Sequence, residues 1–214
     1  GEQPDKQVST ATTEDISKQW KLGICLWTFH SFSFPETLDK VDSSGIKYVE
    51  ISIGQKSGTG LNDSTISQLS PDGIEKLKFM LKNKGIIAES IYLTGDGEIE
   101  SWKKQFDLAK QFDVKFVTGE PPMHLWDSVD SLAGLYGMKS GIDPVEAVKK
   151  LAGHIISIHL KDIAEFNNPK IEDVPVGTGV VNFPGVFEEL KHQGFTGIIY
   201  IERDFEDQPT NLPA

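Results

Sequence analysis

The sequence predicts an α/β protein built on a parallel sheet. Apolar segments rich in β-branched residues alternate with amphipathic helical segments, and a glycine or polar break separates most of them. Strands joined by single helices form right-handed βαβ units, which place neighbouring strands parallel. Residues 153–162, GHIISIHLKD, are interpreted as a strand buried on both faces because its apolar run does not alternate with polar residues. The chain is organised around this strand.

In the first part of the chain, each predicted strand is followed by a helix. The strand that begins at Lys21 ends in Trp27 and Phe29, and the helix after it has the capping-box pattern of Ser33 and Glu36. The alternation continues with strands at 47–52, 86–93 and 114–120 and with helices at 74–81, 99–112 and 125–135. We expect Phe79 and Phe106 to lie on the inward faces of their helices.

The alternation stops after residue 137. Residues 137–142 are too few and too rich in glycine to cross a sheet, yet a new helix begins at once with Asp143 as its N-cap and Glu146 completing a capping box. The strand at 153–162, a loop at 173–179, a helix at 184–193 and a last strand at 196–203 follow. Six strands and six helices leave one helix without a strand before it, so we place a break at residues 139–140.

Composition predicts one globular domain over residues 21–214 and a mobile polar leader over residues 1–20. The chain has 214 residues, 38% of them hydrophobic, which is enough for a substantial core. The net charge of −11 argues against a nucleic-acid partner, because such binding depends on basic side chains that neutralise phosphates. The longest apolar runs are well below the ~20 residues that span a bilayer, so we expect a soluble protein with no membrane span.

The cysteine count and the first residue bear on disulfides, metal sites and location. Cys25 is the single cysteine, which excludes an intramolecular disulfide and a cysteine-rich metal site, and its apolar strand indicates inert burial. The first residue is glycine, which fits either an expression remnant or a processed export precursor, so a cytoplasmic and an exported location both stay open. The oligomeric state is not readable from the sequence.

Ionisable residues stand where the predicted strands end. His159, Lys161 and Asp162 follow the central strand, and Glu202 closes the last one. The carboxyl ends of parallel strands meet at one edge of the sheet, where ligand sites lie. We expect the side chains of His159 and Glu202 to approach within about 5 Å, as two ligands of one ion would. A strand that becomes a solvated loop would also end in Lys and Asp, and this alternative stays open.

The strand-end series WTF, VEI, GEP, HLKD and IER, with the loop VPVGTG between the last two, resembles the xylose-isomerase-like TIM-barrel superfamily of sugar phosphate isomerases and epimerases. The resemblance covers nearly all of residues 21–213 and implies a parallel (β/α)8 TIM barrel. Strands five and six of that barrel are absent from the sequence as given. Such a barrel needs about 250 residues. A natural deletion and an unrecorded segment at residues 139–140 would each explain the deficit.

The resemblance also implies a function and a set of site residues. It implies a metal-dependent sugar or sugar phosphate isomerase or epimerase, which moves a proton or hydride between adjacent carbons of a small carbohydrate. The implied roles are metal binding by His159 and Glu202, catalysis by Glu202 and Lys161, and substrate binding by Trp27, Phe29, Glu50 and Glu120. The family's ligands from strands five and six are missing, so the ligand set is incomplete and Mn²⁺, Mg²⁺, Co²⁺ and Zn²⁺ all stay open.

Two other functions share this fold. A non-catalytic carbohydrate-binding barrel would keep the aromatic mouth and lack the metal. A metal-dependent endonuclease for abasic DNA is disfavoured by the net charge of −11.

Overall fold

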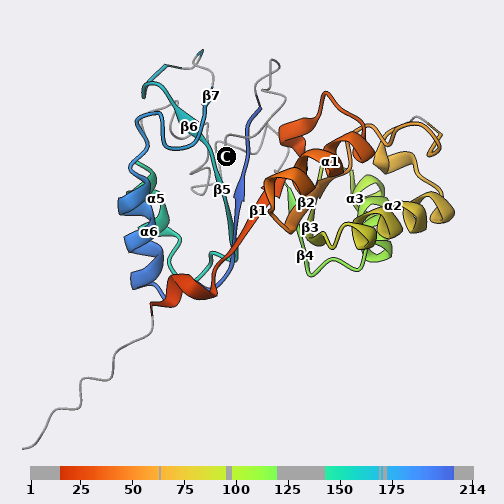
Figure 1. Ribbon diagram of the computed structural model, residues 1–214. Helices are drawn as coiled ribbons and strands as arrows, with labels where there is room; N and C mark the ends of the chain where they lie inside the picture. Colours follow the sequence, from red (N-terminus) through yellow and green to blue (C-terminus); the bar gives the residue numbers. More distant parts are fainter. Residues whose placement is uncertain are drawn as a thin grey trace, which may run out of the picture.

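Six parallel strands form one curled sheet, a half-barrel, in the order β4-β3-β2-β1-β8-β5 (Figure 1). The computed structural model describes residues 15–62, 64–94, 98–119, 143–168, 170 and 173–204. The strands are β1 Lys21–Cys25, β2 Tyr48–Ser52, β3 Ile87–Leu93, β4 Phe116–Gly119, β5 Ser157–Leu160 and β8 Ile198–Ile201. Every pairing within this sheet is parallel. The predicted α/β class and parallel sheet are therefore confirmed.

Helices cover the outer face of the sheet. They are α1 Phe34–Ser44, α2 Pro71–Asn83, α3 Ile99–Gln111, α5 Pro144–Lys150 and α6 Phe183–His192. Figure 1 shows α1, α2 and α3 gathered at the β2–β4 end, while α5 and α6 lie beside β5. Leu38 of α1 and Leu77 of α2 pack in one hydrophobic cluster with Ile51 of β2, and Leu190 of α6 packs in a second cluster with Ile199 of β8. None of the described helices is long and apolar enough to cross a bilayer.

The inner face of the sheet carries a third, smaller cluster. Cys25, Ile198 and Tyr200 form it, and all three are buried. Gly23 lies next to them, where a Cβ atom would meet the Tyr200 ring at 2.8 Å and the Tyr48 carbonyl oxygen at 2.9 Å. Only glycine therefore lets the Tyr200 ring pack this close to β1. This packing closes the inner face below the strand ends.

Short elements lie at both ends of the strands. They are the 3-10 turns η1 Ile16–Gln19, η2 Leu26–Phe29 and η3 Ile66–Gln68, and the antiparallel pair β6 Asp162–Ile163 and β7 Asp173–Val174. Trp20 donates its indole N–H to the Phe195 carbonyl oxygen at 2.6 Å and contacts the Phe187 ring. Trp20, the last residue of the predicted leader, thus packs against the folded chain, and the predicted domain boundary stays a prediction. The predicted mobility of the leader stays a prediction.

The structure corrects several details of the predicted elements. Residues Leu26–Phe29 form a 3-10 turn and not the end of a strand. Phe79 and Phe106, which were predicted to face inward, are 62% and 44% exposed. On α2 the buried stripe follows the spacing of Ile74, Leu77 and Leu81 and leaves Phe79 outside it. On α3 the buried residues are Leu108 and Ala109. The strand predicted to be buried on both faces, β5, is only half-buried at Ser157, Ile158 and His159, and it is an edge strand of the described sheet. The predicted break at residues 139–140 and the predicted helix at 125–135 lie outside the described residues.

Candidate functional site

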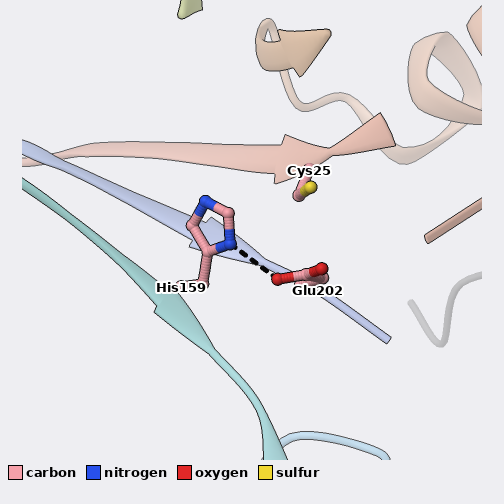
Figure 2. A group of neighbouring side chains, drawn as sticks. All are labelled: Cys25, His159 and Glu202. Carbon is pink, nitrogen blue, oxygen red and sulfur yellow. Dashed lines mark hydrogen bonds and ion pairs between the residues drawn. The ribbon is translucent and has the colours of Figure 1, made fainter. Parts of the chain in front are cut away.

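His159 and Glu202 come together at the carboxyl ends of two adjacent strands. His159 on β5 pairs with Tyr200 on β8, so Lys161 and Glu202 follow side by side where the two strands end. The Nδ1 atom of His159 lies 2.6 Å from Oε2 of Glu202 (Figure 2). The expected approach of these two side chains is confirmed. Their roles as metal ligands and in catalysis stay predictions.

Glu50 lies on the other side of the imidazole. Its Oε1 atom is 2.8 Å from Nε2 of His159, but the two atoms are not aligned as a hydrogen bond, so no hydrogen bond from the described residues reaches Oε1. Its Oε2 atom accepts hydrogen bonds from Ser90 at 2.6 Å and from Thr118 at 2.8 Å. Glu50 is fully buried, and this position favours holding His159 over the predicted contact with a substrate.

Burial and charge act against each other on the central pair. Burial disfavours the imidazolium form of His159, but the hydrogen bond to Glu202 and the Glu50 carboxylate outweigh it and raise the pKa of His159 to about 10. Burial also disfavours the carboxylate form of Glu202, but His159 and Lys161 outweigh it and lower the pKa of Glu202 to about 2. Near neutral pH the pair is therefore an imidazolium and a carboxylate.

Lys161 extends the cluster toward solvent. Its Nζ atom lies 3.3 Å from Oε1 of Glu202 and 2.5 Å from Oδ2 of Asp204. Burial opposes the charge of Lys161, but the two carboxylates outweigh it and hold its pKa above the ordinary value. Burial, aided by the negative charge of Glu202, raises the pKa of Asp204 even though Lys161 opposes this. The site thus joins three carboxyl groups to two basic side chains.

Asp162 fixes the loop beside Lys161. Its Oδ2 atom accepts hydrogen bonds from the backbone N–H groups of Gly177 at 2.9 Å and Gly179 at 2.8 Å, and its Oδ1 atom accepts one from Val181 at 3.1 Å. A Cβ atom at Gly179 would collide with the Ile163 carbonyl oxygen and with Asp162 itself, so glycine is required there. Because Asp162 directly follows Lys161, the same carboxylate fixes the backbone that presents the lysine.

Three side chains at this point could hold a metal ion. One ligand atom each from Cys25, His159 and Glu202 lies within 4.8 Å of the others. Around one tetrahedral ion with Zn–S and Zn–N distances of 2.0–2.3 Å, two ligand atoms lie about 3.5 Å apart. Side-chain movements of about 1 Å would give this spacing, so the three groups fit a metal. Burial raises the pKa of the Cys25 thiol well above its ordinary value, and Glu202 and Glu50 add to this effect.

The remaining predicted site residues have different outcomes. Trp27 is half-buried, stacks on His30 with ring centres 4.8 Å apart, and packs against the cluster of Cys25 and Tyr200 on the inner face. The prediction that Phe29 forms part of a substrate wall is not supported, because Phe29 is 1% exposed and lies in the hydrophobic core under the helices. The 3-10 turn after Cys25 turns Phe29 away from the site. Glu120 lies outside the described residues.

Sequence reasoning did not include two residues that the structure brings to the site. Asp204 was not considered, although it directly follows the predicted last strand at residues 196–203. Cys25 was interpreted as inert because its neighbours in the sequence are apolar. The sequence contains only the period of two along β1, which places the Cys25 thiol on the same face as Gly23. Only the structure shows that this face is the inner one, through the pairing of Cys25 with Glu50 on β2.

Comparisons with known proteins agree with this architecture. Residues 122–213 match the family model described as xylose isomerase-like TIM barrel. A crystal structure of an uncharacterised protein from Parabacteroides distasonis is 30% identical, covers 87% of this chain and 91% of that chain, and has a TM-score of 0.62. The chain belongs to the xylose isomerase-like TIM-barrel family.

Two other proteins similar to this chain have a named function or a bound ligand. An L-ribulose-5-phosphate 3-epimerase of Salmonella paratyphi A is 23% identical over 187 residues, which are 84% of this chain and 63% of that protein. The chain thus spans less than two thirds of the length of this curated relative. The IOLI protein, whose crystal structure contains a zinc atom, shares the fold at 14% identity with a TM-score of 0.53, covering 88% of this chain and 90% of that one.

Proposed function

We propose that this chain belongs to a metal-dependent isomerase or epimerase of sugars or sugar phosphates. The observation that carries the proposal is the pair of His159 and Glu202, 2.6 Å apart at the carboxyl ends of adjacent parallel strands, with Lys161 3.3 Å from the same carboxylate. Active sites of such barrels lie at this end of the strands. The epimerase among the relatives supports the same class of reaction.

In this proposal Glu202 transfers the proton. Epimerisation removes a proton from a carbon next to a carbonyl group and returns one to the opposite face. A carboxylate with a pKa of about 2 is fully ionised near neutral pH, but it is a weak base. Glu202 therefore becomes an effective base only when the hydrogen bond from His159 to its Oε2 atom is released. Its Oε1 atom then still contacts Lys161.

Lys161 stabilises the negative charge that develops on the substrate oxygen. Its pKa is raised, so the ammonium group stays charged near neutral pH, and it lies within 3.3 Å of Glu202. A cation fixed in a partly dry site stabilises developing charge more strongly than one in water. A divalent ion held by His159 and Glu202 would supply Lewis-acid polarisation of the sugar oxygens. Trp27 offers an apolar wall for the sugar carbons.

The test measures product formation by the full-length protein over a panel of ketoses and their phosphates, with Mn²⁺, Mg²⁺, Co²⁺ or Zn²⁺ added. We expect one ketose to be converted to its aldose or epimer. The Glu202→Gln variant should still bind that sugar and lose about 10²–10⁴-fold in turnover, because glutamine keeps the shape of glutamate but cannot accept the proton. Chromatography of the products is decisive because a hydride shift exchanges little hydrogen with solvent.

Glu188→Gln is the matched control. Glu188 lies on α6 with its side chain 75% exposed and paired with Lys191, so the same substitution there should leave turnover unchanged. Absence of conversion across the whole panel, together with saturable sugar binding that does not depend on metal, would replace the proposal with a non-catalytic carbohydrate-binding barrel.

A further inference from the structure

The register of the sheet brings the only cysteine of the sequence to the candidate metal site. Cys25 is the last residue of β1 and pairs directly with Glu50 on β2. On its other side, Ile24 pairs with Ile201, so Cys25 and Glu202 come next on their two strands. Residues at equivalent positions of neighbouring strands face the same side of a sheet. The thiol and the carboxylate therefore both face inward.

The ligand atoms of Cys25, His159 and Glu202 share one small space. They lie within 4.8 Å of one another, and Figure 2 shows the three side chains projecting toward each other from β1, β5 and the end of β8. Cys25 is 1% exposed, so the space around its sulfur atom is enclosed by protein. The thiol therefore faces ionisable groups, although its neighbours along the sequence are apolar.

Glu50 supplies a second, independent observation at the same point. Its buried Oε1 atom has no hydrogen bond from the described residues and lies 2.8 Å from Nε2 of His159. A histidine that ligates a metal through one ring nitrogen is commonly oriented by a carboxylate at the other. Glu50 lies close enough to Nε2 to orient the ring in this way once the two atoms align, which leaves Nδ1, the atom that faces Glu202, to bind an ion.

We infer that Cys25 binds the divalent ion of this site as a thiolate, together with His159 and Glu202. The inference rests on the proposed function for the presence of an ion and adds which residues hold it and which ions it selects. One sulfur, one nitrogen and one oxygen ligand favour Zn²⁺ or Co²⁺ over Mg²⁺ and Mn²⁺, which prefer oxygen. Three protein ligands also leave a fourth position for the substrate. When the metal–sulfur bond forms, the thiol proton passes to solvent, and nothing is oxidised or reduced.

The test uses the full-length protein, stripped with a chelator and titrated with Co²⁺. A thiolate bound to Co²⁺ gives a near-ultraviolet charge-transfer absorption that oxygen and nitrogen ligands do not give. Residues 1–214 contain one cysteine, so a band that arises from them is assigned to Cys25. Loss of the band in a variant without Cys25 makes the same assignment if the full-length protein contains further cysteines. We expect the band to saturate at one Co²⁺ per chain.

Cys25→Ser should abolish the band and weaken the affinity for Co²⁺ and Zn²⁺ by at least about 10–100-fold. Removing a residue that only hydrogen-bonds to a metal ligand already costs that much, and Cys25 would be a ligand itself. Its affinity for Mg²⁺ should not change. Cys25→Ala should behave in the same way, which excludes an effect of the new hydroxyl group. Circular dichroism of both variants checks the fold. His192→Gln is the control, because His192 lies on α6 with its side chain 84% exposed.

The outcomes separate this inference from the proposed function. Co²⁺ binding without the band, lost in His159→Gln, overturns the role of Cys25 and leaves the proposed metal site intact. The band without any sugar conversion supports the role of Cys25 and overturns the proposed reaction. No binding of Co²⁺ or Zn²⁺ overturns both.

Discussion

His159 lies between two carboxylates, with Glu202 at Nδ1 and Glu50 at Nε2. In the metal-free protein the raised pKa keeps the imidazole positively charged, so the ring itself supplies a cation at the place where an ion would bind. Lys161 supplies a second cation, while Glu50, Glu202 and Asp204 supply the carboxyl groups. The two positive charges offset part of the negative charge of the three carboxyl groups, which explains how these ionisable groups can be buried together without a metal.

Glu50→Gln tests this arrangement. Glutamine keeps the size of glutamate but removes the charge next to His159, which leaves a buried imidazolium with one carboxylate partner. We expect the free energy of unfolding of the chelator-treated, full-length protein to fall by about 1–3 kcal/mol, the value of a hydrogen bond or close contact to a charged group. Urea unfolding near neutral pH measures the change.

The control for this prediction is Glu188→Gln on the exposed face of α6, which should stay within about 0.5 kcal/mol. An unchanged unfolding midpoint in Glu50→Gln would show that Glu50 does not stabilise the charge of His159.

At the scale of residues, the sequence located part of the site. His159, Lys161 and Glu202 were found because ionisable groups at the ends of parallel strands must converge. Phe29 was predicted to be part of a substrate wall but lies in the core, because the chain leaves β1 at Cys25 and enters a 3-10 turn that the sequence does not show. The place of Glu50 against His159 depends on how adjacent strands align, and a single sequence contains no signal of that alignment.

At the scale of elements, the antiparallel pair β6–β7 and the turn after it are organised by one carboxylate. Asp162 is 1% exposed and accepts backbone hydrogen bonds from Ile163, Gly177, Gly179 and Val181. Four N–H groups from two segments thus converge on two oxygen atoms. The loop keeps its shape through these bonds, because β6 and β7 have only two residues each.

Asp162→Asn should loosen this loop. The amide nitrogen of asparagine is a donor, so it would face backbone N–H groups that need an acceptor. We expect a loss of about 1.5–3 kcal/mol in the free energy of unfolding, as for a hydrogen bond to a charged group. Hydrogen exchange of the Gly177, Gly179 and Val181 amides should become faster than exchange elsewhere in the chain.

Asp143→Asn is the matched control for this prediction. Asp143 caps α5 by accepting from Val145 N–H at 2.7 Å, and asparagine caps helices as well as aspartate does. Equal protection of the loop amides in Asp162→Asn and in the parent protein would contradict the role of Asp162.

Helix ends were the most predictable elements. The Ser33 and Glu36 pattern predicted the start of α1, where Glu36 accepts from the Ser33 backbone N–H at 2.8 Å, and Gly45 ends the helix in the left-handed conformation. At α5 the N-cap Asp143 is confirmed, but the Glu146 side chain pairs with Lys149, so the predicted capping box is not the observed contact. Short-range signals of this kind depend on neighbouring residues alone, which a sequence contains in full.

At the scale of the whole molecule, one ion-pair group ties together three strands at the amino ends of the sheet. Glu89 is the extra residue of a bulge in β3, with its side chain 5% exposed. It pairs with Lys21 of β1 at 2.6 Å and with Lys115, just before β4, at 2.9 Å. The ion pairs of Glu89 thus stabilise the sheet at the amino ends of its strands, and the cluster around His159 does so at their carboxyl ends.

The Glu89 group predicts a pH dependence of stability. Burial raises the pKa of Glu89, but the hydrogen bonds from Lys21 and Lys115 outweigh it, so the net pKa lies below the ordinary value of 4.5. A carboxyl group with a lowered folded pKa stabilises the protein above its unfolded pKa, and this contribution disappears as the pH falls through the folded value.

Glu89→Gln should therefore lower the free energy of unfolding by about 1–3 kcal/mol near neutral pH, and the difference from the parent protein should close in acid. Urea unfolding across the acid range measures it. Glu100→Gln on α3, whose side chain is 76% exposed, should show no such pH-dependent difference. A constant gap at all pH values would contradict a role for the Glu89 charge.

The overall fold was predictable to the level of the parallel sheet with outer helices, because the alternation of strand and helix segments is a property of the sequence. The order of strands from β4 to β5 was implied by the family resemblance and by the preference for parallel neighbours in βαβ units. The bulge at Glu89 was not predictable, since it depends on the register between β2 and β3.

The Asp162 loop also bears on how a phosphorylated sugar could be recognised. In TIM barrels, phosphate groups are frequently bound by backbone amides of the loops after strands seven and eight, and by the family match this loop follows strand seven. Its glycine-rich sequence would suit that task, yet the Gly177, Gly179 and Val181 amides already point at a carboxylate of the same chain. The Asp162 carboxylate thus occupies the place where these amides would bind a phosphate. A substrate phosphate would have to displace Asp162 or be bound by other groups, whereas an unphosphorylated sugar would make no such demand.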